Sequence, residues 1–275
     1  MAHLNKFIIS LCIFALVYAL GKTSFSQNKK QAEDIIEDTN FVWSQLTDGI
    51  EFSTYHLIGD TSVLRFEVYL LRIDPLKIKT EIVLAKDLER SASDIKSMAN
   101  SRKALVGINA NFFDLNSNPL GLIIRNGKKI NKFHTGGKTL SGIFYIKDNE
   151  PKIVFRGTPI PDEVELAIQS GPRLMLDGNQ IKLTPSEHST RRSGIATTQD
   201  GKIIIYSTLL RFPGATLSQI QKMLLFPELN IKDALNLDGG SSSQFYINEL
   251  IAPKGEEILL SGGDAVPVGL VFIKR

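Results

Sequence analysis

Short runs of strand-forming residues, separated by turn residues, dominate the chain from Phe41 onward and constrain its fold most strongly. Asn126-Gly127 and Asp148-Asn149 each separate two such runs and predict tight hairpins, and Gly59-Asp60 predicts another. The expected strands cover residues 50–58, 63–73, 76–84, 104–110, 122–125, 128–131, 140–147, 152–155, 165–169, 174–176, 194–198, 203–207, 234–237, 244–247 and 266–273. Strands in this number must bury their apolar faces in a core built on sheets.

Helical patterns are few and do not alternate strictly with the strands. One helix is expected at Ser93–Ser101, with Ser93 as its cap. A second is expected at Thr216–Phe226, because Thr216 and Gln219 have capping-box spacing and apolar residues share one face. No linker, repeat or low-complexity tract follows Phe41. The sequence therefore predicts an α+β fold, a single domain with a large mixed β-sheet core and a few packed helices.

The N-terminus has the pattern of a signal peptide. The apolar run Phe7–Leu20 has fourteen residues, which is short for a membrane span. Ser24-Phe25-Ser26 is a small-x-small cleavage pattern, Val17-Tyr18-Ala19 is a second candidate, and an uncleaved anchor is the alternative. We therefore expect a signal peptide at residues 1–26, a polar tether at 27–40 and one domain at 41–275. The protein would be exported, periplasmic or secreted, without a membrane span after cleavage.

Charge and cysteine content exclude several functional classes. The formal net charge is +3, and Lys6 and Lys22 in the expected signal peptide account for two of these charges. A nearly neutral mature chain without a Lys/Arg-rich run gives no basis for nucleic-acid binding. Cys12 is the only cysteine and lies in the apolar run, so the mature protein would lack thiolate chemistry. Motifs of serine hydrolases, zinc proteases and phosphate-loop enzymes are absent.

The segment Ala234–Ser243 is the most informative for chemistry. Strand alternation places its two leucines in the core and the Asn236 and Asp238 side chains on the opposite face. Gly239-Gly240 lets a ligand approach the main chain, and its N–H groups, with the following serines, predict a donor cluster for an anion. The alternative is a tight turn in which Asp238 caps its own backbone.

A second segment, Gly107–Asp114, has polar residues on one strand face. Asn109, Asn111 and Phe113 share that face, and two amides beside an aromatic ring suit sugar hydroxyls. The alternative is a polar strand end that enters a loop, since residues 114–119 are rich in turn formers.

Two further segments contribute arginines. Arg173 follows a Gly-Pro pair, and Arg192 precedes an expected strand. A guanidinium fork matches two phosphate oxygens, although surface arginines commonly pair with carboxylates instead. His134 and His188 could titrate near neutral pH but lie in polar stretches, which favours solvated side chains.

In this order, the four segments resemble the phosphodiester glycosidase family. The resemblance covers about residues 100 to 275 and is carried by Asn109–Asp114 with Leu120-Gly121, Ser170–Gly178, Arg192–Ala196 and Asn236–Ser242. The positions that correspond to the family's motif positions are Asn109, Asn111, Phe113, Gly171, Arg192, Asn236, Asp238, Gly239, Gly240 and Ser242. The residue type departs from the family pattern at Ala110 and Asn111, which stand in place of two glycines, and at Ser241 and Asp264. Relatives often carry an arginine at the place of Asp264.

The resemblance implies a glycosidase, a hydrolase that releases free sugar and a phosphomonoester from a carbohydrate phosphodiester. Asp238 would be nucleophile or base, with Asp114 as second choice, and Arg192 would pair with the departing phosphate. The expected substrate-binding residues are Asn109, Asn111, Phe113, Arg173, Asn236, Gly239, Gly240 and Ser242. No cofactor is required, but a divalent cation could bind if Asp114, Asp177 and Asp238 converge. The alternatives are a non-catalytic glycan- or phosphopolymer-binding envelope protein and a phosphodiesterase that cuts P–O.

Overall fold

The computed structural model describes residues 41–58, 65–137, 139–183, 188–208 and 214–275. The expected signal peptide, the tether and the Gly59-Asp60 turn lie outside these residues. By contacts, the described residues of 41–57 and 66–275 form one compact unit. In the part of the chain that is described, no helix is both long and apolar enough to cross a membrane.

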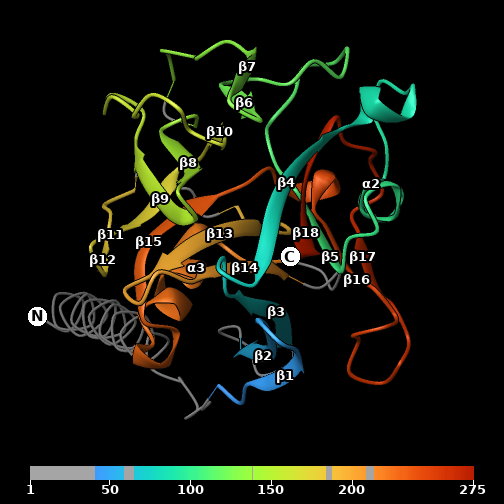
Figure 1. Cartoon of the computed structure of the whole chain (residues 1–275). Helices are drawn as coiled ribbons and strands as arrows, with labels where there is room; N and C mark the ends of the chain where they lie inside the picture. The colour runs from blue at the N-terminus through green and yellow to red at the C-terminus, as the bar shows by residue number, and fades with distance from the viewer. Residues whose placement is uncertain (1–40, 59–64, 138, 184–187, 209–213) are drawn as a thin grey trace, which may run out of the picture. The chain divides into compact units, whose positions relative to one another are not determined.

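The first of three sheets has eight strands (Figure 1), and Arg173 and Asn236 of the expected site lie on two of them. In spatial order the strands are β1 (Ser44–Thr47), β2 (Ile50–Ile58), β3 (Arg65–Ile73), β14 (Ile203–Thr208), β13 (Ser193–Thr198), β15 (Ile231–Asn236), β11 (Arg173–Leu176) and β12 (Asn179–Gln180).

Two five-stranded sheets complete the fold. The second sheet is ordered β7 (Lys128–Asn131), β6 (Ile123–Arg125), β10 (Leu166–Ser170), β8 (Gly142–Lys147) and β9 (Glu150–Phe155). The third is ordered β17 (Ile258–Ser261), β16 (Gln244–Ile247), β5 (Val106–Asn109), β18 (Val268–Lys274) and β4 (Ile78–Leu84). Buried side chains from all three sheets, among them Leu235, Phe144 and Ile108, form one continuous apolar core.

The strand-rich α+β expectation agrees with this fold, but the expected single mixed sheet does not. The core is divided among three sheets, and every strand pairing described is antiparallel. Short turns explain the antiparallel pairing, because a parallel neighbour needs a long crossover connection. Asp148 and Asn149, for example, join β8 to β9 with φ angles of 52° and 62°.

The two described α-helices lie where the sequence predicts them, with one change of cap. Helix α3 (Leu217–Leu224) begins at Thr216, whose hydroxyl and Gln219 form the expected capping box. Helix α2 (Ile95–Ser101) is capped by Asp94, whose carboxylate accepts the Ser97 N–H at 2.7 Å. Ser93 does not cap it, because its backbone forms a bridge with Val266. The described residues also form three 3-10 turns, η1 (Ala85–Leu88), η2 (Pro227–Leu229) and η3 (Gly240–Ser242).

The topology brings several strand ends to one place. Strands β11 and β13 both run antiparallel to β15, so their first residues lie beside its last residues. Strand β5 of the third sheet ends at the same place, because the Ala110 carbonyl accepts the Asp238 N–H at 3.1 Å. Residues at these strand ends therefore face one another although they are distant in sequence.

Candidate active site

Four segments that the sequence singled out meet at the end of β15. The amide side chains of three asparagines and one backbone N–H link them. These hydrogen bonds run from Asn109 Nδ2 to Asp238 O (2.7 Å), from Asn111 Nδ2 to Gln169 O (3.0 Å), from Asn236 Nδ2 to Gly171 O (3.0 Å) and from Gly240 N to Arg191 O (2.9 Å).

Asp238 is the half-buried carboxyl at this junction. Its Oδ1 accepts the Gly239 N–H at 2.9 Å, and the Ser242 hydroxyl also hydrogen-bonds to the carboxyl. Burial raises the pKa of Asp238 to about 6, and the negative charge of Asp264 acts in the same direction. The two hydrogen bonds oppose this rise only in part. Asp238 is therefore suited to accept a proton near neutral pH.

Asp264 is a second carboxyl beside the same turn. Its carboxylate accepts the Ser241 hydroxyl, and its N–H donates to the Ser241 carbonyl at 3.0 Å. The sequence marked Asp264 only as a departure from the family pattern. No local motif reveals its position, because the loop before β18 folds back onto the turn through hydrogen bonds to distant backbone atoms.

The two glycines after Asp238 make a close backbone approach possible. A Cβ at Gly239 would lie 2.8 Å from the Arg191 carbonyl oxygen, and Gly240 has a φ of 62°. The N–H groups of Gly239, Gly240 and Ser242 donate to Asp238, to Arg191 O and to Gly239 O. Each of these three N–H groups thus has an acceptor within the protein, and the expected anion-binding role of this turn stays a prediction.

Arg192 is half-buried at the start of β13, next to the end of β15. Gly194 pairs with Asn236 in the ladder, so Arg192 lies two residues further along, toward the Asp238 end. Its guanidinium donates to the carbonyl oxygens of Ala215 (2.9 Å, from Nε) and His188 (2.7 Å, from Nη2). Burial lowers the pKa of Arg192, and no described carboxylate forms an ion pair with it. The site therefore contains a cation held by neutral groups.

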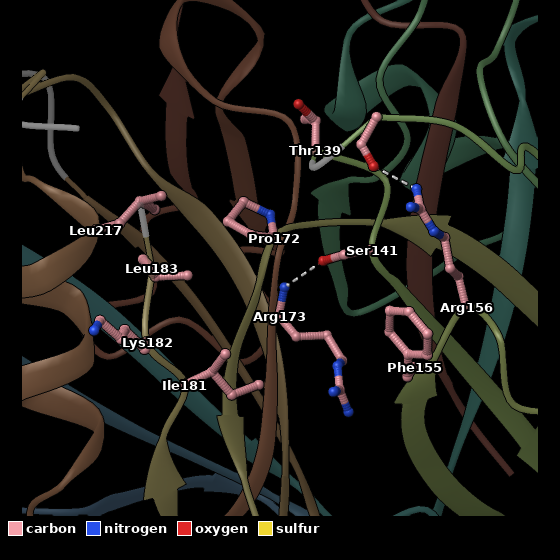
Figure 2. Close-up of a pocket in the computed structure, with 11 residues that line it drawn as sticks. Thr139, Ser141, Phe155, Arg156, Pro172, Arg173, Ile181, Lys182, Leu183 and Leu217 are labelled. Atoms are coloured by element: carbon pink, nitrogen blue, oxygen red, sulfur yellow. Dashed lines mark hydrogen bonds between the residues drawn. The ribbon is translucent and has the colours of Figure 1, made fainter. Parts of the chain in front are cut away.

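Arg173 lies at the start of β11 and lines a separate cavity of about 410 Å³ (Figure 2). Its backbone N–H donates to the Ser141 hydroxyl at 3.0 Å, and its guanidinium carbon lies 5.5 Å from the centroid of the Phe155 ring. Burial lowers the pKa of Arg173. This arginine therefore belongs to the edge of the site.

The three asparagines of the predicted site are buried, and they brace the backbone. Asn109 also accepts the Gln244 N–H on its Oδ1 at 3.0 Å. The Asn111 and Asn236 amide nitrogens donate to backbone carbonyls, while their Oδ1 atoms are buried without a protein partner among the described residues. Their hydrogen bonds hold the four segments in register, so their first role is positional.

The side chains of Phe113 and Asp114 make packing and hydrogen-bond contacts within the fold. The Phe113 ring packs against the apolar cluster under α2. The Asp114 carboxylate accepts the N–H groups of Asn116 (2.9 Å) and Asn118 (2.8 Å), and the Asn118 amide at 3.0 Å. These hydrogen bonds, the Asn118 amide first, lower the pKa of Asp114. The Asp114 carboxylate, which is the second choice for catalysis, is therefore held by hydrogen bonds from its own loop.

The acids expected to hold a divalent cation do not converge. The Asp177 backbone N–H donates to the Asp233 carboxylate, in the first half of β15, at 3.2 Å, whereas Asp238 follows the end of that strand. Within the described ranges, no group of three or more histidine, cysteine or acidic side chains is arranged to hold a metal. His134 and His188 are exposed, in agreement with the solvated interpretation.

Solved structures with the same fold include an enzyme domain. The catalytic domain of zebrafish N-acetylglucosamine-1-phosphodiester alpha-N-acetylglucosaminidase, auto-inhibited by its pro-peptide, matches with a TM-score of 0.64 and 18% identity. The match covers 86% of this chain and 88% of that one. A hypothetical protein from Synechocystis matches with a TM-score of 0.59 and 17% identity, over 87% of this chain and 64% of that chain. A search of curated proteins found no match.

The fold thus places the chain in the structural class of this glycosidase domain. The family model for phosphodiester glycosidases matches residues 102–273, which is more than half of the chain. The protein belongs to the phosphodiester glycosidase family, as the four segments indicated. This family consists of glycosidase-like hydrolases.

Proposed function

We propose that the protein hydrolyses the glycosidic C–O bond of a sugar-1-phosphodiester and releases free sugar and a phosphomonoester. The observation that carries this proposal is the half-buried Asp238 carboxyl, with a pKa of about 6, beside the strand end that holds Arg192. A proton acceptor and an unpaired cation are the two groups that this cleavage needs. Family membership supports the reaction class.

The charges that develop during the reaction explain the need for both groups. Cleavage builds positive charge on the anomeric carbon and negative charge on the departing phosphate. A phosphomonoester has a second pKa of about 6, so this leaving group needs little protonation. The Arg192 guanidinium would pair with its charge. At pH 7 Asp238 is mostly ionised, and its pKa near that pH suits a base that takes a proton from the attacking water.

We also propose that the protein acts outside the cytoplasm on a carbohydrate phosphodiester. The signal-peptide pattern of residues 1–26 supports export. The near-neutral charge of the remaining chain gives no support for a nucleic-acid partner.

The test is release of free sugar from a panel of sugar-1-phosphodiesters. Loss of a general base costs about 100-fold or more in rate, so we expect Asp238→Asn to lower kcat/KM by at least that factor. Asp114→Asn is the matched control, because the Asp114 carboxylate accepts hydrogen bonds from its own loop. This variant should retain most activity. In the wild type, kcat/KM should rise as the pH increases through about 6.

Two results would contradict this proposal. An active Asp238→Asn variant would remove the base from the mechanism. Measurable binding without turnover of any phosphodiester would favour a non-catalytic envelope protein.

A further inference from the structure

A cavity of about 410 Å³ opens between the end of β9, the start of β11 and the first residue of α3 (Figure 2). Apolar side chains form much of its wall, from Phe155, Pro172, Ile181, Leu183 and Leu217. This volume lies in the range of pockets that hold small molecules, about 300–1,000 Å³. The cavity can therefore take the apolar body of a ligand.

Three cations line the same cavity, namely Arg156, Arg173 and Lys182, and none of its described lining residues is acidic. Arg156 donates to the backbone carbonyls of Gly136 and Gly137, which leaves its charge without a counterion. No ion pair joins any of the three cations to a described carboxylate. Like charges on one concave wall repel each other, and a bound anion relieves that repulsion.

The cavity borders the Asp238 site through the backbone. Pro172 lines the cavity, and its carbonyl accepts the Asn236 N–H at 3.0 Å. Asp238 follows two residues later. With about 5 Å between paired strands and about 3.3 Å per residue, the Cα atoms of Pro172 and Asp238 lie within about 10 Å. A substrate with its sugar at Asp238 would therefore have to span about 10 Å to place its far end in the cavity.

We infer that this cavity holds the aglycone of the phosphodiester, and that this aglycone carries an anionic group next to an apolar one. The assignment of the cavity to the aglycone rests on the proposed function, whereas the expected ligand chemistry rests on the cavity alone. The apolar wall selects the body of the ligand, and Arg156, Arg173 and Lys182 select its charge.

The probe for this chemistry is phenyl phosphate, with binding to the full-length protein measured by isothermal titration calorimetry. We expect inorganic phosphate and phenol, each with half of the recognised features, to bind at least tenfold more weakly. Hexyl phosphate tests whether the apolar group must be aromatic. Lys182→Gln and Phe155→Ala should each weaken phenyl phosphate binding about threefold to tenfold, since each change removes one charge or one apolar contact.

Lys152→Gln is the matched control. Lys152 lies on β9 with Phe155 but pairs with Glu150 at 3.0 Å and does not line the cavity. This variant should bind phenyl phosphate like the wild type. Equal affinity of all three variants, or no preference for phenyl phosphate over phenol, would overturn the inference.

Kinetics separate this inference from the proposed function. Lys182→Gln should raise KM for phosphodiesters with an anionic aglycone and leave KM for neutral aglycones unchanged. If sugar is released but Lys182→Gln changes neither KM, the cavity assignment fails and the proposed function stands. If no sugar is released but Asp238→Asn and the wild type bind phenyl phosphate equally, the cavity remains an anion site and the hydrolase proposal fails.

Discussion

Replacing Asp238 with asparagine is expected to stabilise the fold above pH 6. Burial raises the pKa of Asp238 from 3.8 to about 6, so between these values the folded protein keeps a proton that the unfolded chain has released. The free energy of unfolding therefore falls as the pH rises from about 4 to about 6. Above pH 6 Asp238 is ionised in both the folded and the unfolded state, and the fall in the free energy of unfolding is complete. Asparagine cannot ionise, so the free energy of unfolding of the variant does not fall in this way.

The size of the effect follows from the shift of the pKa. A change of about two units corresponds to about 3 kcal/mol, at about 1.36 kcal/mol per unit. Asparagine keeps an oxygen that can accept the Gly239 N–H, but a neutral acceptor is weaker by about 1 kcal/mol. The net gain is about 2 kcal/mol, which is equivalent to about 4–8 °C in Tm for a folded unit of this size.

Thermal unfolding followed by circular dichroism at pH 4, 6 and 8 measures this difference. Asp114→Asn is a control of opposite sign, because hydrogen bonds lower the pKa of Asp114 and its charged form stabilises the loop. That contribution exists above about pH 4 and disappears as the pH falls. Asp114→Asn should therefore have a lower Tm at pH 8. A lower Tm for Asp238→Asn at pH 8 would refute the burial argument and make Asp238 a turn residue.

Three further predictions concern packing, phosphate recognition and export. Gly194→Ala should abolish folding or lower Tm strongly, because a Cβ would lie 2.1 Å from Tyr206 ring and hydroxyl atoms; an unchanged Tm would contradict this packing. Arg192→Gln should impair hydrolysis of phosphodiesters more than of aryl glycosides in steady-state kinetics, and equal losses would remove its phosphate role. Mass spectrometry of the exported protein should show a chain that begins after Ser26, whereas an intact N-terminus would indicate an anchor.

Local turn chemistry explains why much of the fold is readable from the sequence. Asn126 and Gly127 adopt φ angles of 50° and 73°, which few other residue pairs tolerate, and they join β6 to β7 as expected. The strands β1, β12 and β17 were not predicted. These edge strands have two to four residues, and their partners rather than their own patterns create them.

The site was only partly readable for a different reason. Alternation along β15 correctly places its leucines in the core and Asn236 on the other face. Which groups the asparagine amides bind depends on carbonyls that distant strands supply, such as Gly171 O. No pattern within one segment carries that information. The same holds for Asp264, which reaches the Asp238 turn through tertiary hydrogen bonds.

Hydrolysis in oxygen-18 water tests the central claim most directly. The purified enzyme would cleave a sugar-1-phosphodiester in labelled water, and mass spectrometry would follow the label in both products. Cleavage at the anomeric carbon, with water activated by Asp238, places the label in the released sugar. Label in the phosphate would show P–O cleavage and contradict the account.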